Sequence, residues 1–314
     1  MTKSEVRNSK LRKLTQVEAK KIIVVVNLDK PDALELGKEL LEFLRREVNV
    51  VANNIEGRLD LGNLPEADFI TVLGGDGTIL STVRAMKDKQ VPVIGVNVGK
   101  LGFLAEFSLE QLKGSLAEIL ADQVEISRRI MLSCCVRGPE REQEVNVMAV
   151  NELAVMVGPP FRMIEVSIRI GEEHLALCTG DGLVVATPTG STAYNLSAGG
   201  PILYSTLEAA VITPLAAHSL NFRPVVVRLD KPIRLRCNEI GRRGRGAEAE
   251  QSETRSSAVI AIDGQATVPL KSEDEVIITR AEPRFQLVHN SRQSQWDLLN
   301  TKLNWGIMPN YNQS

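Results

Sequence analysis

The sequence has few of the residues that build metal sites or disulfide frameworks. Its 314 residues include three scattered histidines and four cysteines, which are Cys134, Cys135, Cys178 and Cys237. No two of these cysteines form a C-x-x-C pair, so neither a zinc site nor a disulfide framework is expected. Free thiols are typical of a reducing compartment, and we therefore predict a cytoplasmic protein.

Long apolar runs and an excess of charge of one sign are also missing. No stretch approaches about eighteen consecutive apolar residues, so we expect no membrane-spanning helix. Residues 1–20 are polar and lack the apolar core of a secretion signal. The net charge of −2 creates no field that would attract nucleic acid or an anionic membrane. The composition is ordinary for a globular protein, and the chain is long enough for two domains.

The first part of the chain alternates strands with helices. Short β-branched runs predict buried parallel strands over residues 21–27, 48–53, 69–75 and 91–98. Apolar residues at helical spacing follow three of these strands. Two pairs of residues resemble helix N-caps, Asp32 with Glu35 and Ser108 with Gln111. This alternation predicts a doubly wound α/β domain over residues 1–125.

The pattern changes after residue 125 to that of a β-rich, sandwich-like domain over residues 126–290. Alternating apolar and polar residues predict strands over 166–170, 232–237, 257–264 and 274–280. A polar stretch at 241–257 predicts a hairpin insertion, with a loop for an anionic ligand as the alternative. Residues 291–314 return to helical spacing, and we expect this tail to pack on the first domain.

A Gly-Gly-Asp-Gly-Thr segment at residues 74–78 ends one of the predicted strands. Its glycines can reach positive φ angles and let main-chain N–H groups face outward. A helix that begins near Thr78 adds a partial positive charge at its N-terminus. Together these features predict a cradle for phosphate.

Asp76, in the middle of this cradle, does not suit a site for phosphate alone, because carboxylate and phosphate repel each other. Phosphoryl transfer resolves the conflict, since it needs both a cradle for the phosphoryl group and an acceptor for a hydroxyl proton. A tight strand-to-helix turn capped by an aspartate is the alternative interpretation.

Two further segments favour the functional interpretation. Residues 95–104 form another strand that ends in glycines, and Asn97 would lie at the same sheet edge as Asp76. Residues 180–201 combine glycines with many hydroxyl side chains. A sugar and a purine require many short hydrogen bonds together with flat apolar contacts, which such a loop can supply.

These segments, in this order, resemble the NAD kinase family over most of the chain. The matching motifs are G-G-D-G-T at 74–78, N-x-G-x-L-G-F-L at 97–104, Asn-Glu at 151–152, D-G with the Thr/Ser/Gly run at 181–201, I-D-G-Q at 262–265 and L-N-W-G at 303–306. Phosphofructokinases and lipid kinases resemble the first motif alone. The long Thr/Ser/Gly run distinguishes NAD kinases from them.

The resemblance implies the reaction and the residues that perform it. The reaction is ATP-dependent phosphorylation of the 2′-hydroxyl of the adenosine ribose of NAD, which gives NADP. Asp76 would be the general base and would contact NAD together with Gly77. The other implied NAD-binding residues are Asn151, Glu152, Arg162, Asp181, Thr192, Ala193, Tyr194, Asn195, Leu196, Ser197 and Gln265. The predicted phosphate-binding residues are Gly74, Gly75, Gly77, Thr78 and Asn97.

Other expectations concern cofactors, partners and alternatives. We expect ATP with Mg²⁺ or another divalent metal, whose ligands the sequence does not identify, and a homodimer or homotetramer. A related kinase acting on a lipid or sugar, and a regulator that binds NAD or NADP without turnover, are the alternative functions. Asp181-Gly182 and Asp263-Gly264 also match the sequence of hairpin turns.

Overall fold

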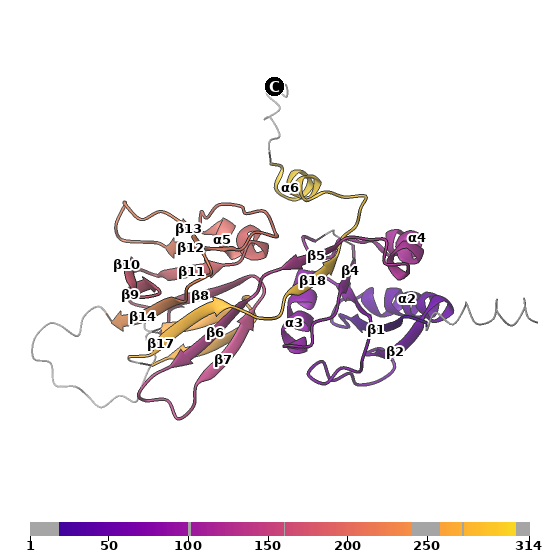
Figure 1. The fold of residues 1–314 in the computed structure, drawn as a ribbon, viewed down its shortest axis with the longest axis horizontal. Helices are drawn as coiled ribbons and strands as arrows, with labels where there is room; N and C mark the ends of the chain where they lie inside the picture. The colour runs from indigo at the N-terminus through magenta and orange to yellow at the C-terminus, as the bar shows by residue number, and fades with distance from the viewer. Residues whose placement is uncertain (1–18, 100–101, 160, 240–257, 272, 306–314) are drawn as a thin grey trace, which may run out of the picture. The chain divides into compact units, whose positions relative to one another are not determined.

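A computed structural model describes residues 19–99, 102–159, 161–239, 258–271 and 273–305 (Figure 1). The chain divides into two compact units. The first comprises Met1–Thr82, Val91–Ile126 and Leu287–Ser314, and the second comprises Val83–Gln90 and Ser127–Gln286. The insertion predicted at 241–257 lies outside the described residues.

A six-stranded sheet of order β2-β1-β3-β4-β18-β5 contains the four strands β1 to β4 of the first unit. Its strands are β1 (Lys21–Val26), β2 (Asn49–Asn53), β3 (Phe69–Gly74), β4 (Val93–Asn97), β5 (Ile126–Arg129) and β18 (Phe285–Val288). β1 pairs in parallel with β2 and β3, and β4 pairs in parallel with β3 and β18. The carboxyl ends of β1, β3 and β4 therefore meet at one edge of the sheet, where ligands bind in such folds.

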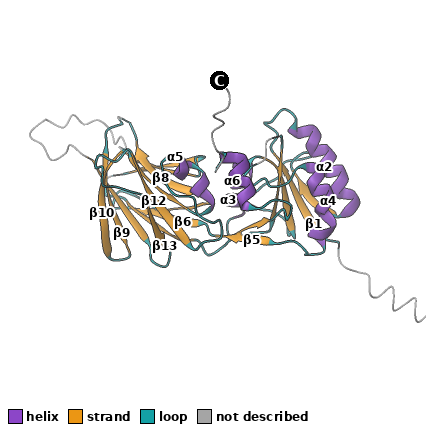
Figure 2. Ribbon diagram, turned by 90° about the horizontal axis from the view of Figure 1, so that it is seen from above, coloured by secondary structure: helices purple, strands orange, loops and turns teal. Residues whose placement is uncertain are grey.

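Helices cover this sheet (Figure 2). Apolar residues of α2 (Ala33–Glu47) and α4 (Leu109–Leu120) pack with one set of strand residues in a shared core. The third helix, α3 (Asp76–Met86), packs on β4 at Gly95, where an added Cβ would lie 2.8 Å from the Ile79 Cδ1 atom. Because Gly95 alternates with the core residues Ile94 and Val96, α3 covers the opposite face of the sheet.

The first residues of the helices agree only in part with those predicted from the sequence. Ser108 and Gln111 form the predicted capping box at α4. Asp32 is the N-cap residue of α2 but its side chain makes no cap hydrogen bond, because its backbone, at φ −91° and ψ −2°, is helical instead of extended. The helix expected near Thr78 begins earlier, at Asp76, since the Gly75 carbonyl accepts hydrogen bonds from the N–H groups of Thr78 and Ile79.

The second unit consists almost entirely of antiparallel strands in two six-stranded sheets. One sheet contains β10 (Glu173–Gly180), β9 (Ile164–Ile170), β14 (Ile233–Glu239), β17 (Glu275–Arg280), β6 (Leu132–Arg137) and β7 (Val145–Ala149). The other contains β13 (Val225–Arg228), β12 (Ala209–Leu215), β11 (Gly182–Ala186), β8 (Glu152–Val157), β15 (Ala258–Ile262) and β16 (Ala266–Leu270). Alternate residues of both sheets pack in one buried core, as in a sandwich.

The C-terminal segment Leu287–Ser314 belongs to the first unit. Leu287 of β18 pairs with Val93 of β4, and α6 (Gln295–Leu303) follows, with a capping box formed by Ser294 and Asp297. Short helical turns η1 (Thr189–Thr192) and α5 (Tyr194–Ser197) complete the second unit. Among the described residues, every helix is too short or too polar to span a membrane.

Candidate active site

The Asp76 turn, residues 74–78, connects β3 to α3 at the carboxyl edge of the first sheet. Asn27, which follows the neighbouring strand β1, donates its side-chain Nδ2–H to the Thr78 Oγ1 atom at 3.1 Å. The Thr78 carbonyl in turn accepts hydrogen bonds from the hydroxyls of Ser81 and Thr82. These contacts hold the turn to both the adjacent strand end and the helix that follows.

Three main-chain N–H groups hold the Asp76 carboxylate. The N–H of Phe103 donates to Oδ2 at 2.9 Å. The N–H groups of Leu104 and Ala105 donate to Oδ1 at 3.0 and 3.2 Å. Oδ1 thus accepts two hydrogen bonds from this loop and Oδ2 accepts one, so a lone pair of Oδ2 stays available for another donor.

The glycines around Asp76 are required for space. A Cβ on Gly102 would lie 2.0 Å from the Asp76 Oδ1 atom, and a Cβ on Gly74 would lie 2.6 Å from the Thr78 Oγ1 atom. Neither residue, nor Gly75, has a positive φ angle. Close approach of neighbouring groups, rather than a left-handed backbone, is therefore the physical reason for glycine at positions 74 and 102.

Asn97, one of the predicted phosphate-binding residues, lies at the end of β4 and uses its side chain within the chain. Its Nδ2–H donates to the Phe107 carbonyl at 2.8 Å. Glu106, the residue before Phe107, is 2% exposed. Its Oε2 atom lies 2.9 Å from His289 Nδ1 and accepts the Asn290 N–H at 3.0 Å. Asn97 and Glu106 therefore fix the end of the loop whose N–H groups hold Asp76.

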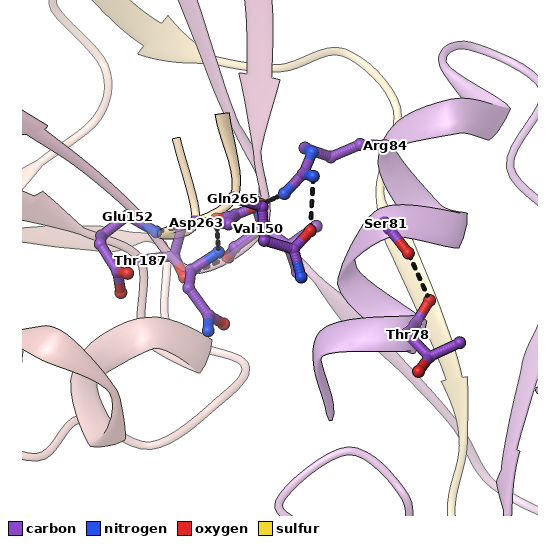
Figure 3. Close-up of polar contacts among 9 residues, drawn as sticks. Thr78, Ser81, Arg84, Val150, Glu152, Thr187, Asp263 and Gln265 are labelled. Carbon is purple, nitrogen blue, oxygen red and sulfur yellow. Dashed lines mark hydrogen bonds and ion pairs between the residues drawn. The ribbon is translucent and has the colours of Figure 1, made fainter. Parts of the chain in front are cut away.

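In the second unit, the Asp263 carboxylate organises the Asn151-Glu152 segment. It accepts hydrogen bonds from the main-chain N–H groups of Val150, Asn151 and Glu152 at 2.7–3.1 Å. Its buried side chain also pairs with Arg84, whose Nη1 atom lies 2.8 Å from Oδ2 (Figure 3). The carboxylate thus fixes the backbone from which the predicted NAD-binding side chains project.

Asp263 and Gly264 form the turn between β15 and β16, with positive φ angles of 48° and 63°. Two positive φ angles define a type I′ hairpin turn, so this prediction is confirmed. Gln265 follows the turn and accepts a hydrogen bond from Arg84 Nη2 at 2.6 Å (Figure 3). The guanidinium of Arg84 therefore bridges Asp263 and Gln265, a role that no sequence motif indicated.

Glu152 carries a buried acceptor without a partner. The residue is 5% exposed, and its Oε2 atom contacts no hydrogen-bond donor among the described residues. Burial, followed by the negative charge of Asp263, raises the pKa of Glu152 to about 7, although a main-chain hydrogen bond from Tyr194 acts in the opposite direction. A buried acceptor left open in this way suits a hydroxyl donor of a ligand.

The Thr/Ser/Gly loop packs directly on the Asn151-Glu152 segment. Thr187 donates its hydroxyl to the Val150 carbonyl at 2.7 Å, and a Cβ on Gly190 would lie 2.2 Å from the Asn151 carbonyl oxygen. Thr189 is buried, and its Oγ1 atom has no partner among the described residues. Thr189 is thus a candidate binding residue absent from the predicted set, because the sequence shows only a density of hydroxyls.

Other residues of this loop differ in accessibility. Asn195 is fully buried, and its side chain bonds to the Ser191 and Pro201 carbonyls and to the Thr213 hydroxyl. Its side-chain atoms are therefore used within the fold. Tyr194 and Ser197 are exposed, whereas Thr192, Ala193 and Leu196 are half-buried.

Asp181 and Arg162 are exposed residues of the same unit. Asp181 lies between β10 and β11, which belong to different sheets, so the alternative of a hairpin turn at Asp181-Gly182 is wrong. The chain changes sheets here: the Asp181 N–H bonds to the Leu215 carbonyl, and its carbonyl accepts the Val157 N–H.

The geometry defines a class of protein. A carboxylate fixed beside a glycine turn at the carboxyl edge of a parallel sheet suits transfer of a phosphoryl group to a hydroxyl. A loop rich in hydroxyl side chains and glycines, with buried polar atoms that lack a hydrogen-bond partner among the described residues, suits a nucleoside ligand. These are the features of a phosphotransferase that acts on a nucleotide.

The chain belongs to the NAD kinase family. The family's ATP-NAD kinase N-terminal domain matches residues 22–124, and its C-terminal domain matches residues 150–290. A NAD kinase from Geobacter sp. (strain M21) is 35% identical over 301 residues, covering 91% of this chain and 99% of that protein.

Solved structures agree with this assignment. The NAD kinase of Archaeoglobus fulgidus in complex with ATP is 27% identical, with a TM-score of 0.70 over 90% of this chain and 98% of that one. Yeast NADH kinase complexed with NADH has the same fold, with a TM-score of 0.80 at 24% identity over 95% and 91% of the two chains. The chain is therefore an enzyme, a kinase that phosphorylates NAD with ATP.

Proposed function

We propose that Asp76 is the general base, which accepts the proton of the adenosine ribose 2′-hydroxyl of NAD. The observation that carries this proposal is the carboxylate held by three main-chain N–H groups at the start of α3. A carboxylate fixed in this way needs no reorientation before the reaction. The open lone pair of Oδ2 receives the hydroxyl proton.

The terminal phosphoryl group of ATP lies on the glycine turn that precedes α3, where main-chain N–H groups and the helix N-terminus favour an anion. The ribose 2′-oxygen forms a bond to the terminal phosphorus while the bond from that phosphorus to ADP breaks. Because the transition state is loose, the position of the two reactants matters more than the strength of the base. The products are NADP and ADP.

Mg²⁺ or another divalent ion enters with ATP as part of the substrate. No group of three or more His, Cys, Asp or Glu side chains that could hold a metal occurs in the described part of the chain. Mg²⁺ readily binds substrate phosphates and water. Its contribution is to reduce the negative charge of the donor phosphates.

The dinucleotide binds to the β-rich unit. Asn151 and Glu152 contribute side-chain hydrogen bonds, and the buried open acceptor of Glu152 takes a ribose hydroxyl. Thr189 contributes its unpartnered hydroxyl. Asn195 contributes only through its main chain, because its side chain is used in the fold.

The remaining predicted NAD-binding residues contribute surface around Asn151, Glu152 and Thr189. Thr192, Ala193 and Leu196 provide half-buried surface, and Tyr194, Ser197, Asp181, Arg162 and Gln265 provide exposed side chains. Residues 1–125 with the tail 291–314 form the other domain of the proposed pair, which carries Asp76 and the glycine turn.

We also propose a homodimer or homotetramer in the cytoplasm. Leu175 and Leu177 on β10, and Val225 and Val226 on β13, are exposed apolar residues, and both strands lie at sheet edges. An exposed apolar sheet edge favours association with a second copy of the chain. The four cysteines are free, which is consistent with a reducing compartment.

Replacement of Asp76 by Asn tests the proposed role. NADP formation from NAD, Mg²⁺ and ATP should fall by about 10²–10⁴-fold, the typical effect of a lost general base. Calorimetry should show NAD binding at the wild-type affinity, because the base is needed only during transfer. Wild-type turnover in the variant would exclude Asp76 from the chemistry.

A further inference from the structure

Lys30 reaches the Asp76 turn from a neighbouring strand end. β1 and β3 are adjacent and parallel, and beyond them the Asn27 N–H donates to the Leu73 carbonyl at 2.9 Å. The Asn27 side chain is bonded to Thr78, and its carbonyl accepts the Lys30 N–H at 3.3 Å. The short segment 27–30 is therefore fastened to the turn.

The Lys30 ammonium lies against the glycine at the centre of this turn. Its Nζ atom would be 3.4 Å from a Cβ placed on Gly75. Gly75 has no side chain, so the ammonium approaches exposed main chain. No described residue forms an ion pair with Lys30, although other lysines of this unit, such as Lys113, pair with one or two carboxylates.

The partly buried Lys30 side chain lies in a position that favours an anion. The first N–H groups of α3 place a partial positive charge beside it, so the ammonium and the helix start together attract an anion. The Asp76 carboxylate of the same turn is already held by the N–H groups of residues 103–105. Ammonium and main-chain N–H groups together match the oxygens of a phosphoryl group. The cation and the helix start thus converge on the space that the proposed mechanism assigns to the donor.

We propose that Lys30 binds the non-bridging oxygens of the terminal phosphoryl group of the donor. The proposal rests on the proposed function, in which this group lies on the glycine turn. Lys30 exchanges no proton: Asp76 takes the hydroxyl proton, and the ammonium offsets the negative charge of the phosphoryl oxygens during transfer. It is a donor-binding residue, whereas NAD binding does not depend on it.

Lys30→Met tests the proposal, with Lys38→Met as the matched control. Lys38 is an exposed lysine of α2, and its replacement removes the same charge from the same unit. The affinity for ATP of the Lys30→Met variant should fall by about tenfold or more, the effect of one charge-assisted hydrogen bond, and its NAD affinity should be unchanged. Lys30→Arg should restore part of the loss, and Lys38→Met should match the wild type.

A second measurement uses the wild-type enzyme and avoids any effect of the substitution on folding. Acetylation of surface lysines is followed by mass spectrometry with and without ATP. ATP should slow the modification of Lys30 several-fold and leave that of Lys38 unchanged, and NAD alone should protect neither lysine. Equal acetylation of Lys30 with and without ATP overturns the proposal.

The two proposals fail in different ways. NADP formation by the wild type, together with an unchanged ATP affinity and rate in Lys30→Met, overturns the role of Lys30 and leaves that of Asp76 intact. Wild-type turnover in Asp76→Asn, together with weakened ATP binding in Lys30→Met, overturns the role of Asp76 and supports that of Lys30.

Discussion

Gly102 leaves room for the Asp76 carboxylate, since a Cβ at position 102 would lie 2.0 Å from Oδ1. The contact explains why a glycine begins the loop whose N–H groups hold the proposed base. Any side chain at this position must displace either the carboxylate or the loop. The geometry of Asp76 therefore depends on a residue that is 26 positions away in the chain and makes no chemical contribution itself.

Gly102→Ala should reduce turnover with little effect on NAD binding. The added methyl group pushes the carboxylate from its three N–H donors, and a displacement of about 1 Å at a reacting group can cost about 10²-fold in rate. Steady-state kinetics and NAD calorimetry measure the two effects. Gly57→Ala is the control, because nothing lies within 4 Å of a Cβ at that position. Wild-type turnover in Gly102→Ala would show that the loop adapts.

Asp263→Asn should destabilise the protein and weaken NAD binding. An amide cannot accept all four hydrogen bonds that the carboxylate receives from Arg84 and residues 150–152. Loss of the charge also leaves the guanidinium unpaired, which costs about 3 kcal/mol for a largely buried pair. Urea unfolding measures the change in free energy.

Asp230→Asn provides the comparison for this experiment. Asp230 pairs with Arg228 at 2.8 Å, but the two side chains are 50% and 81% exposed. Exposed pairs contribute less than about 1 kcal/mol, so this variant should unfold close to the wild-type urea concentration. An equal loss in both variants would contradict the organising role of Asp263.

Thr189→Val should weaken NAD binding and leave stability unchanged. The Thr189 hydroxyl has no partner among the described residues, so its removal breaks no hydrogen bond of the fold. A lost hydrogen bond to the ligand corresponds to about a fivefold to tenfold change in affinity. Thr213→Val is the contrasting variant, because its hydroxyl donates to Asn195 at 2.6 Å and should therefore stabilise the loop. Stability lost equally in both variants would argue against an open hydroxyl at Thr189.

Local patterns predicted much of the fold and the identity of several site residues. Alternation in residues 232–237 gave the correct faces of β14, because Ile233 and Leu235 are buried while Arg234 and Arg236 are accessible. The cap at Ser108 was also correct, since a capping box involves residues three apart. Such features depend on neighbours in the sequence.

Contacts between distant residues could not be predicted in this way. Arg84 and Asp263 are separated by 179 positions, and no motif connects them. Asn195 belongs to a recognisable run, yet its side chain accepts a hydrogen bond from Thr213 on β12, 18 positions further along the chain. The sequence identifies a polar residue, whereas the fold decides whether that residue faces a ligand or another side chain.

Glu152 should make the stability of the protein depend on pH in a direction opposite to that of most carboxylates. Its pKa is raised from 4.5 to about 7 by burial and by the charge of Asp263. Between these values the folded state retains a proton that the unfolded state has lost. The stabilisation is therefore complete below about pH 4.5 and is lost as the pH rises to about 7.

Comparison of the wild type with Glu152→Gln isolates this effect, because glutamine does not titrate. The free energy of unfolding of the wild type minus that of the variant should fall by about 3 kcal/mol between pH 4 and pH 8. Urea unfolding at intervals of half a pH unit gives the curve. A difference that rises with pH would mean that the native carboxylate is stabilised in its ionised form, and that Glu152 is not the open, desolvated acceptor through which we propose that NAD is bound.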